Sequence, residues 1–417
     1  MKTRVIEICK NILIVLLICS LLLLSLMALP VESVRSNPWL SKLLRPLAPL
    51  LGTSSAELTY VEPAAPRADG IKPAEISLCR SARRTSAVWD ADKVDEMFAT
   101  FSPLLAQIFS ETENYAQISS VQLQNAARTD SVYFRYAGVL PAEVIVCQWG
   151  NARKLPLGSF DRFLIAAENG NLSLYLCGLV SYRAPTSLPA ELLTDLLDHY
   201  EEDSSAFCFE LELPQHPFSL VSSEKPVVNA YNCSDPTDNR FVETLATALG
   251  FNPYAETRYT NAQGTDCFTE TGASLEISDS GLVQLTMDNN RYNAPSRSFD
   301  DIAATASALT DTMLKEISGA GKLHLVSVTR SGDSTVCQFQ YLVNGVPLLL
   351  PQPAAAVTFS GTAVTRASVQ LYRFVPTGKS LYPLPAAQAA ALLPDGSELM
   401  LVYSIGPDGA LSADWLQ

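Results

Sequence analysis

Histidine, a common metal ligand, is scarce in this chain. Among 417 residues there are three histidines, His199, His216 and His324, and no two of them can share one face of a helix. A zinc site on a helix needs two such histidines or a second cluster of ligands. His199 is typical of a cation near a helix C-terminus, and the other two have no evident partner. We therefore expect no metal site and no cofactor.

Motifs of nucleophilic catalysis and phosphate binding are also missing. There is no G-x-S-x-G elbow, and no Ser–Lys or Cys–His pair stands out. Gly319–Lys322 resembles a phosphate loop only superficially, because Glu316 and Leu323 stand where that motif needs Gly and Ser or Thr. Acidic pairs such as Asp300-Asp301 and Glu201-Glu202 fit a helix start and a solvated surface. We expect no enzymatic activity and no catalytic residues.

The chain has no excess of positive charge. The 29 Lys and Arg are outnumbered by 43 Asp and Glu, which gives a formal net charge of −14. Binding to a phosphate backbone needs clustered Lys and Arg, so a nucleic acid is excluded as the expected partner. The acidity itself favours solubility.

Paired cysteine motifs are missing too. The chain has nine cysteines but no C-x-x-C, and the seven beyond the N-terminal apolar run are an odd number. Several lie in alternating apolar patterns, which favours buried free thiols that act as small apolar side chains. One or two disulfides stay open as an alternative. The seven are Cys79, Cys147, Cys177, Cys208, Cys233, Cys267 and Cys337.

One long apolar run is present, and it decides where the rest of the chain lies. Ile12–Leu29 (ILIVLLICSLLLLSLMAL) has no charge, no Gly and no Pro, and Pro30 follows it. A helix of this length measures roughly 27 Å, close to the bilayer core of about 30 Å. The leader before it has three basic residues and one acidic residue. This bias predicts a cytoplasmic N-terminus and an extracytoplasmic body.

A cleaved signal peptide is the alternative to a membrane anchor. Its apolar region is usually about 7–15 residues long and ends in a small-x-small site. The run here is longer, and Leu26-Met27-Ala28 is a poor cleavage site because Leu26 is large. We therefore predict a cytoplasmic leader over residues 1–11, an uncleaved single-pass helix over 12–30 and a location in the cell membrane, with the lipid bilayer as a partner.

Three side chains inside the run are small or carry a hydroxyl group: Cys19, Ser20 and Ser25. Such residues let transmembrane helices approach closely and hydrogen-bond. They are our candidate face for a partner helix, although a serine more often bonds back to its own helix.

A juxtamembrane segment over residues 31–72 follows the anchor. Trp39, Lys42 and Arg45 in it suit the lipid headgroup layer as interfacial anchors. An ordinary short helix packed on the first domain is an equal alternative. The end of the segment is rich in Pro and Ala and is typical of a linker.

The remaining chain predicts an α+β fold of antiparallel sheets with packed helices, divided into domains over residues 73–213, 214–290 and 291–417. In the first, Asp90 or Asp92 is expected to cap a helix whose apolar residues recur with a 3.6-residue period from Val94 to Ile108. Pro103 is expected to kink it.

Further elements of the first domain are expected from its second half. The runs Phe163–Ala167 and Leu172–Cys177 flank Glu-Asn-Gly-Asn and predict a hairpin. Ser187 is expected to cap a helix over Leu188–Glu202, and Phe207–Leu213 to form a closing strand.

The second and third domains repeat one order of elements. After an initial strand over Val227–Tyr231 in the second domain, each has a helical face, over Phe241–Leu249 and Phe299–Ile317, and continues with alternating strands. Gly250 is expected to cap the end of the first helix, and Ser298 with Asp301 resembles a capping box at the start of the second. Turns such as Asp279-Ser280-Gly281 and Asn344-Gly345 separate the strands. The last long run, Ala363–Phe374, is expected to be one strand. This order suggests two related α+β units.

Two stretches carry a family resemblance. Asn252–Leu285 (NPYAETRYTNAQGTDCFTETGASLEISDSGLVQL) is similar to a helix-to-meander segment, and Tyr341–Phe374 (YLVNGVPLLLPQPAAAVTFSGTAVTRASVQLYRF) to a strand–NG–strand–G-turn pattern, of the YycH/YycI family. With the basic leader and the single membrane helix, the chain resembles these regulators of the WalK (YycG) sensor histidine kinase of Gram-positive bacteria. The resemblance implies a two-component system regulator in the cell envelope, with the kinase and a second family member as partners.

The expected function is therefore that of a membrane-anchored, non-enzymatic protein that modulates a sensor histidine kinase through its transmembrane helix and outer domains. The alternative is a tethered cell-envelope module that binds wall polymer or lipid, which predicts a concave apolar or acidic groove. An envelope hydrolase would need two close carboxylates in a cleft.

Overall fold

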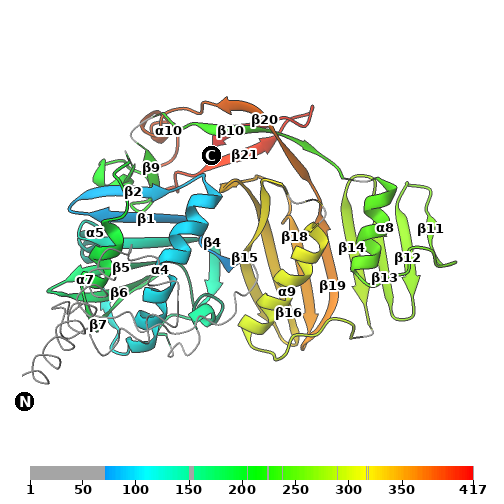
Figure 1. Cartoon of the computed structure of the whole chain (residues 1–417), viewed down its shortest axis with the longest axis horizontal. Coiled ribbons are helices and arrows are strands. Elements are labelled where there is room, and N and C mark those ends of the chain that lie inside the picture. Colours follow the sequence, from blue (N-terminus) through cyan, green and yellow to red (C-terminus); the bar gives the residue numbers. More distant parts are fainter. Residues whose placement is uncertain are drawn as a thin grey trace, which may run out of the picture. The chain divides into compact units, whose positions relative to one another are not determined.

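Two large β-sheets with helices packed on them make up most of the structure, a computed structural model (Figure 1). It describes residues 71–149, 155–203, 205–222, 225–236, 238–288, 290–315, 317 and 319–416. These belong to one unit that begins at Leu58. The strands of both sheets pair antiparallel. The predicted α+β class with antiparallel sheets is confirmed.

The first sheet has seven strands in the order β2-β1-β4-β5-β6-β7-β3. The hairpin predicted in it is confirmed, since Glu168 pairs with Asn171 across Asn169-Gly170, both of which have a positive φ. This is the turn geometry that Asn-Gly favours. The strands are β1 (Glu75–Arg80), β2 (Arg83–Ala87), β3 (Ala116–Ile118), β4 (Ser131–Pro141), β5 (Ser159–Glu168), β6 (Asn171–Cys177) and β7 (Ser181–Pro189).

Helix α4 (Ala91–Glu111) packs on one face of this sheet together with α7 (Glu191–Leu197). Asp90 caps α4, as predicted, by accepting a hydrogen bond from the backbone N–H of Lys93 at 3.1 Å. The predicted apolar face is buried in the core, and the helix continues through Pro103. Two shorter elements follow β4: α6 (Ala142–Val146) and the 3-10 helix η3 (Cys147–Trp149).

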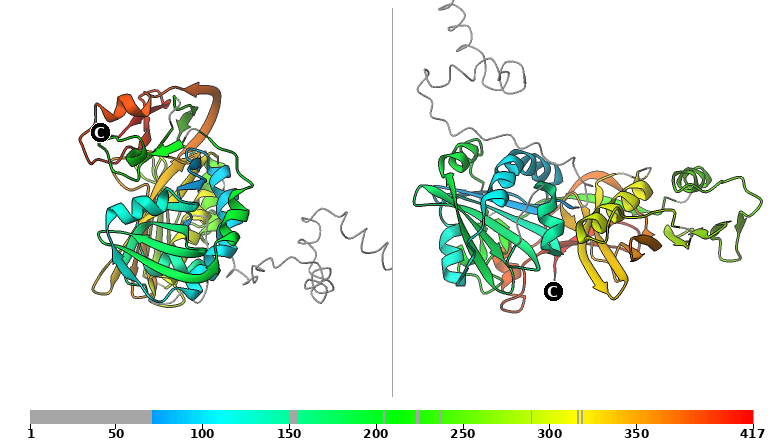
Figure 2. Two further views of the ribbon diagram at one scale, coloured as in Figure 1. Left: turned by 90° about the vertical axis from the view of Figure 1, so that its left-hand side faces the viewer. Right: turned by 90° about the horizontal axis from the view of Figure 1, so that it is seen from below.

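The opposite face of the sheet carries a second cover. Helix α5 (Ser120–Ala127) lies there, across the sheet from α4 (Figure 2, left). Leu123 of α5 joins a small core with Tyr133 and Phe218. The rest of this cover comes from a segment that the sequence analysis did not place there: β8 (Ser205–Phe207), η4 (Cys208–Glu210) and β9 (Leu220–Ser222).

The second sheet has nine strands, eight of them in the order β11-β12-β13-β14-β19-β18-β16-β15, with β17 beside β16. Its strands bury alternate residues, as the sequence pattern predicts. The strands are β11 (Tyr259–Thr260), β12 (Asp266–Glu270), β13 (Ala273–Ile277), β14 (Leu282–Met287), β15 (Gly321–Ser331), β16 (Ser334–Val343), β17 (Val346–Pro347), β18 (Ala355–Ser360) and β19 (Ala363–Gln370).

Each half of the second sheet is a helix followed by a four-stranded meander. Helix α8 (Asn239–Ala248) precedes β11–β14, and α9 (Phe299–Leu314) precedes β15, β16, β18 and β19. The predicted caps Ser298 and Gly250 lie at the ends of α9 and α8. The last strands of the two halves pair with each other, β14 with β19. Strands from the predicted second and third domains thus share one sheet.

Smaller elements complete the chain between and after the sheets. A two-stranded ribbon joins β10 (Val228–Ser234) to β20 (Arg373–Leu381), and a C-terminal hairpin joins β21 (Leu401–Ile405) to β22 (Leu411–Trp415). The short helix α10 (Ala386–Ala390) lies between them in sequence.

The two sheets adjoin where β4 passes β15, and both strands carry a bulge there. Gly138 in β4 approaches Val326 in β15 so closely that a Cβ atom on Gly138 would lie 2.1 Å from the carbonyl oxygen of Val326. Real atoms cannot approach so closely, so glycine is required at this position.

Three predicted elements are wrong. Ser187 caps no helix but lies in β7, because residues 181–189 pair with β6, and the helix after it covers only Glu191–Leu197. Phe207–Leu213 is not a strand, because after Phe207 the chain forms the 3-10 turn η4 and a loop, and its aromatic side chains pack on the sheet instead of extending it. Ala363–Phe374 is split between β19 and β20 because the chain leaves one sheet for another there.

No helix in the part of the chain that the structure covers is long and apolar enough to cross a membrane. The predicted anchor over Ile12–Leu29 lies outside the described residues. So do the candidate partner face and the candidate interfacial anchors, which are Cys19, Ser20, Ser25, Trp39, Lys42 and Arg45.

Candidate functional site

A groove of about 950 Å³ opens on the second face of the first sheet, beside α5. Its walls come from the starts of β5 and β7, the strand β3, the N-terminal half of α5 and the loop 216–218. The apolar side chains that line it are Ile118, Leu123, Val139, Leu157, Phe160, Leu179, Val180 and Phe218. A concave, mainly apolar hollow with a few polar groups is the usual form of a ligand site.

The rim of this groove exposes large apolar side chains to solvent. Leu179, at the tip of the β6–β7 turn, is fully exposed, and Val139 and Val180 beside it are 57% and 36% exposed. Scattered exposed leucines are common, but apolar residues gathered around one hollow mark a contact surface. We call this set, Val139, Leu179 and Val180, the apolar rim.

Two arginines lie side by side in the first sheet, and one of them, Arg162, lines the groove. Arg135 of β4 and Arg162 of β5 are directly opposite each other in the strand register, and their side chains are 14% and 11% exposed. Buried guanidinium groups need carboxylate partners. Arg135 pairs with Glu75 at 2.7 Å and with Glu398 at 2.8 Å.

Arg162 completes this cluster with three further contacts. Its Nε and Nη2 groups both donate to Oδ2 of Asp161, at 3.0 Å and 2.6 Å, and Nη2 also donates to Oε1 of Glu398. Its Nη1 group lies 3.2 Å from Nδ1 of His216. Every nitrogen of this guanidinium group therefore already has a partner. We call Glu75, Arg135, Asp161, Arg162 and Glu398 the arginine cluster.

Glu398 reaches the cluster from a distant part of the chain. Backbone hydrogen bonds hold its segment against the loop before β9: the N–H of His216 donates to the carbonyl oxygen of Ser397 at 2.8 Å, and that of Gly396 to Pro214 at 2.8 Å. The N–H of Leu399 donates to the hydroxyl of Ser219 at 3.0 Å. The cluster thus joins the first sheet to the C-terminal segment.

The cluster keeps its groups charged. Burial alone would raise the pKa of Glu398, but Arg135 and Arg162 outweigh it and hold the pKa below its usual value. Burial likewise would lower the pKa of Arg135, and Glu75 and Glu398 raise it instead. Both guanidinium groups and Glu398 are ionised at neutral pH.

His216 is neutral in this setting. Burial lowers its pKa, and the adjacent Arg162 lowers it further. Nδ1 accepts a hydrogen bond from the backbone N–H of Phe218 at 3.3 Å, so the ring proton lies on Nε2. His216 therefore brings a hydrogen-bond donor to the groove but no charge.

Cys177 also lines the groove and faces Arg162 across β5 and β6. Burial raises its pKa to about 12, so it is a thiol and a poor nucleophile at neutral pH. Cys79, Cys177, Cys208, Cys267 and Cys337 are free and buried, which confirms the prediction of buried free thiols for these five.

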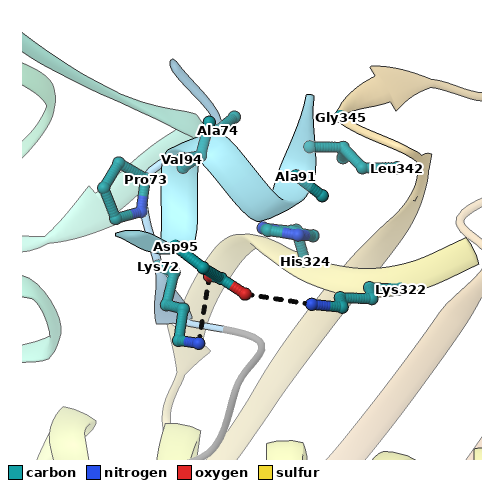
Figure 3. A pocket seen from close by; sticks show the side chains of 10 residues that line it. All are labelled: Lys72, Pro73, Ala74, Ala91, Val94, Asp95, Lys322, His324, Leu342 and Gly345. Atoms are coloured by element: carbon teal, nitrogen blue, oxygen red, sulfur yellow. Dashed lines mark hydrogen bonds and ion pairs between the residues drawn. The ribbon is translucent and has the colours of Figure 1, made fainter. Parts of the chain in front are cut away.

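A second polar cluster lies at the junction of α4 and β15 (Figure 3). Asp95 of α4 accepts from Lys72 and from Lys322 of β15, both at 3.1 Å. His324 beside them is 8% exposed, and its Nδ1 has no partner among the described residues. The small cavity here, about 10 Å³, has room for one water molecule. Burial lowers the pKa of His324 to about 4, with Lys322 adding to the effect.

The residues considered as functional candidates from the sequence either have structural roles or lie outside the described residues. His199 is exposed just after α7, and Asp300 and Asp301 lie in the first turn of α9, as expected. Lys322 of the rejected phosphate loop lies in a strand and pairs with Asp95. Within the described ranges, no group of three or more His, Cys, Asp and Glu is placed to hold a metal ion.

The arginine cluster is the feature that the sequence analysis missed. A signal was present, because Arg135 and Arg162 interrupt strongly apolar strands. Charged residues in such strands are rarely buried unless they are paired. Glu398, however, is separated from Arg135 by 263 positions, and no local pattern connects them.

Comparison of the chain with known protein families, curated proteins and solved structures finds no match.

Proposed function

We propose that this protein is a membrane-anchored, non-enzymatic regulatory protein that recognises a partner protein through the groove and modulates a sensor histidine kinase. The observation that carries the binding role is the apolar rim around a hollow of about 950 Å³. Apolar surface of this kind is stabilised when a partner covers it. The kinase as the partner rests on the resemblance to the YycH/YycI family.

The membrane helix proposed for Ile12–Leu29 gives this binding a physical advantage. Confinement to a bilayer raises the effective concentration of two proteins for each other. A partner that binds one state of a signalling protein more tightly than the other shifts the balance between them. The protein then regulates without any chemical step of its own.

Two changes to the intact chain test the proposal in membranes. Replacing Ile12–Leu29 with an unrelated spanning helix is expected to change the output of the kinase that copurifies with the wild type. Leu179→Asp on the apolar rim is expected to reduce that copurification, whereas Val375→Asp, at a 48% exposed position of β20, is expected to leave it unchanged. Unchanged kinase output and unchanged copurification in the first two variants contradict the proposal.

A tethered cell-envelope module that binds wall polymer or lipid is the second candidate, and the same groove favours it because it is concave and mainly apolar. This function needs the anchor only as a tether. The helix-swapped chain is then expected to bind purified wall polymer or lipid vesicles as tightly as the wild type. Loss of that binding on helix replacement contradicts the second candidate.

A further inference from the structure

We propose that the groove binds a segment of a partner protein that combines apolar side chains with one basic side chain. This inference rests on the proposed binding function and names the chemistry of the partner. The apolar part follows from the lining and the apolar rim, which together offer mainly carbon surface. The basic part follows from the charge balance of the arginine cluster.

The arginine cluster has one negative charge in excess. Two guanidinium groups, of Arg135 and Arg162, face three carboxylates, of Glu75, Asp161 and Glu398, and two minus three leaves −1. His216 adds no charge because it is neutral at pH 7. A guest with a positive group restores the balance, and a guest with a negative group increases the excess.

An unused hydrogen-bond acceptor of Asp161 indicates the same basic guest. Asp161 lines the groove, and both hydrogen bonds that the structure gives it end on Oδ2. Its Oδ1 is therefore available to a donor. Arg162 offers an anion much less, since four of its five N–H groups donate to Asp161, Glu398 and His216, and one N–H of Nη1 remains. A phosphate or carboxylate that accepted this single N–H would lie beside the carboxylates of Asp161 and Glu398, which repel it.

The free acceptor on Asp161 and the largely used donors of Arg162 disfavour phospholipids and phosphate-bearing polymers as ligands and favour a peptide. Anionic groups bind where guanidinium or ammonium groups are free to donate, and Arg162 already donates four of its five N–H groups, three of them to the carboxylates of Asp161 and Glu398. Ile118 in the wall belongs to β3, the edge strand of the sheet. An edge strand can hydrogen-bond to the backbone of an extended segment, which a lipid chain cannot reproduce.

The experiment selects peptides on the full-length protein embedded in lipid nanodiscs, because detergent would compete for an apolar groove. A phage-displayed library of random dodecapeptides is the probe, and empty nanodiscs remove membrane binders. We expect the selected peptides to share two or more large apolar residues and a Lys or Arg. A selection that enriches acidic peptides, or none, overturns the inference.

Two variants with matched controls then test the site. Leu179→Asp is expected to weaken the binding of a selected peptide about tenfold or more, since the peptide no longer covers an apolar side chain there, and Val375→Asp is expected to have no effect. Asp161→Asn is expected to weaken the peptide about fivefold, and Asp195→Asn, at an exposed position of α7, to have no effect. The loss at Asp161 should disappear when norleucine replaces the basic residue of the peptide.

The outcomes separate this inference from the proposed function. Equal losses for Asp161→Asn with the basic and the norleucine peptide overturn the basic-group assignment. Tight binding of phosphatidylglycerol vesicles that Leu179→Asp abolishes, without peptide binding, overturns the peptide in favour of a lipid. If peptides bind as expected but no kinase copurifies, the groove inference stands and the kinase proposal fails. If the helix swap alters kinase output but no peptide is selected, the kinase proposal stands and the groove inference fails.

Discussion

The two large sheets bury their strands in different ways. In β6 of the first sheet every residue after Asn171 is buried, whereas β13 and β14 of the second sheet bury alternate residues. A strand buried on both sides needs a cover on both faces of its sheet. The first sheet obtains its second cover from α5 and from segments distant in sequence, and the candidate groove lies where that cover is incomplete.

The two sheets also differ in how far apart in the sequence their contacting segments lie. The second sheet is built from two meanders, in which most neighbouring strands are also neighbours in sequence. The second cover of the first sheet depends on segments after residue 204 and on Glu398. Substitutions that affect one sheet and spare the other therefore test how far the two are independent.

The largest effect is expected where both sheets meet. Gly138→Ala would place a Cβ atom 2.1 Å from the carbonyl oxygen of Val326, and the backbones of β4 and β15 must separate to accept it. We expect a loss of about 3 kcal/mol in the free energy of unfolding, in the upper range for overpacking. Denaturant unfolding of the intact protein measures this loss.

Gly158→Ala is the matched control, because no atom lies within 4 Å of the added Cβ atom. Hydrogen exchange read peptide by peptide should show faster exchange in both β4 and β15 for Gly138→Ala. Equal stability of the two variants would show that the two bulges do not support each other.

A similar loss in the free energy of unfolding, limited to acidic pH, is expected to arise from His324. Its pKa is about 4 in the folded protein against 6.5 for an ordinary histidine, so protons bind the unfolded chain more readily. The stability that the neutral ring provides is complete above pH 6.5 and decreases as the pH falls toward 4. At about 1.4 kcal/mol per pKa unit the total is about 3 kcal/mol.

His324→Leu is expected to reduce this part of the pH dependence between pH 6.5 and 4, measured as the midpoint of denaturant unfolding at each pH. Asp95, Lys72 and Lys322 face the ring and stay unchanged in this variant. His199→Leu, at an exposed position, is the control. An unaltered slope in His324→Leu would show that other groups cause the acid sensitivity.

A smaller effect, limited to the first sheet, is expected at Glu398. Glu398→Gln removes the charge shared by Arg135 and Arg162, and removing one partner of a buried pair is costly. The side chain is 33% exposed, so solvent reduces the loss to about 2 kcal/mol. Hydrogen exchange should accelerate in β4 and β5 and not in β13 and β14.

The sign of the pH effect follows from the lowered pKa of Glu398. Its stabilisation is present above the pKa of the unfolded chain and is lost as the pH falls through the lower folded value. Glu398→Gln should therefore flatten that part of the acid response. The control Glu202→Gln removes an exposed contact to Arg83 at 3.7 Å and should cost less than about 0.5 kcal/mol.

The comparison also explains which elements the sequence predicted. The caps Asp90 and Ser298, the Asn169-Gly170 turn and the alternation of β13 and β14 are confirmed. Each depends on residues a few positions apart, where propensity and periodicity act. The helix expected from Ser187 is wrong because pairing with β6, a tertiary interaction, holds that residue in a strand.

Much less of the candidate site than of the fold could be predicted from the sequence. Arg162 directly precedes the predicted strand Phe163–Ala167, yet the pairing of Arg135 and Arg162 with Glu398 depends on the way the C-terminal segment returns to the first sheet. The groove is likewise bounded by β3 and α5, two short elements that the sequence analysis did not identify. A three-residue strand has too few positions to show a period.

The smallest effect on stability is expected on the apolar rim, where the exposed Leu179 can be compared with the buried Leu123. Leu179 is fully exposed, whereas Leu123 of the adjacent α5 is 4% exposed. Leu123→Ala should cost about 2–3 kcal/mol because it leaves a cavity, and Leu179→Ala should change the free energy of unfolding by less than about 0.5 kcal/mol. If Leu179 serves a partner and not the fold, the same substitution should still weaken peptide binding in nanodiscs. A measurable loss of stability without a loss of binding would instead assign Leu179 to the packing of the β6–β7 turn, and the apolar rim would no longer support a binding role.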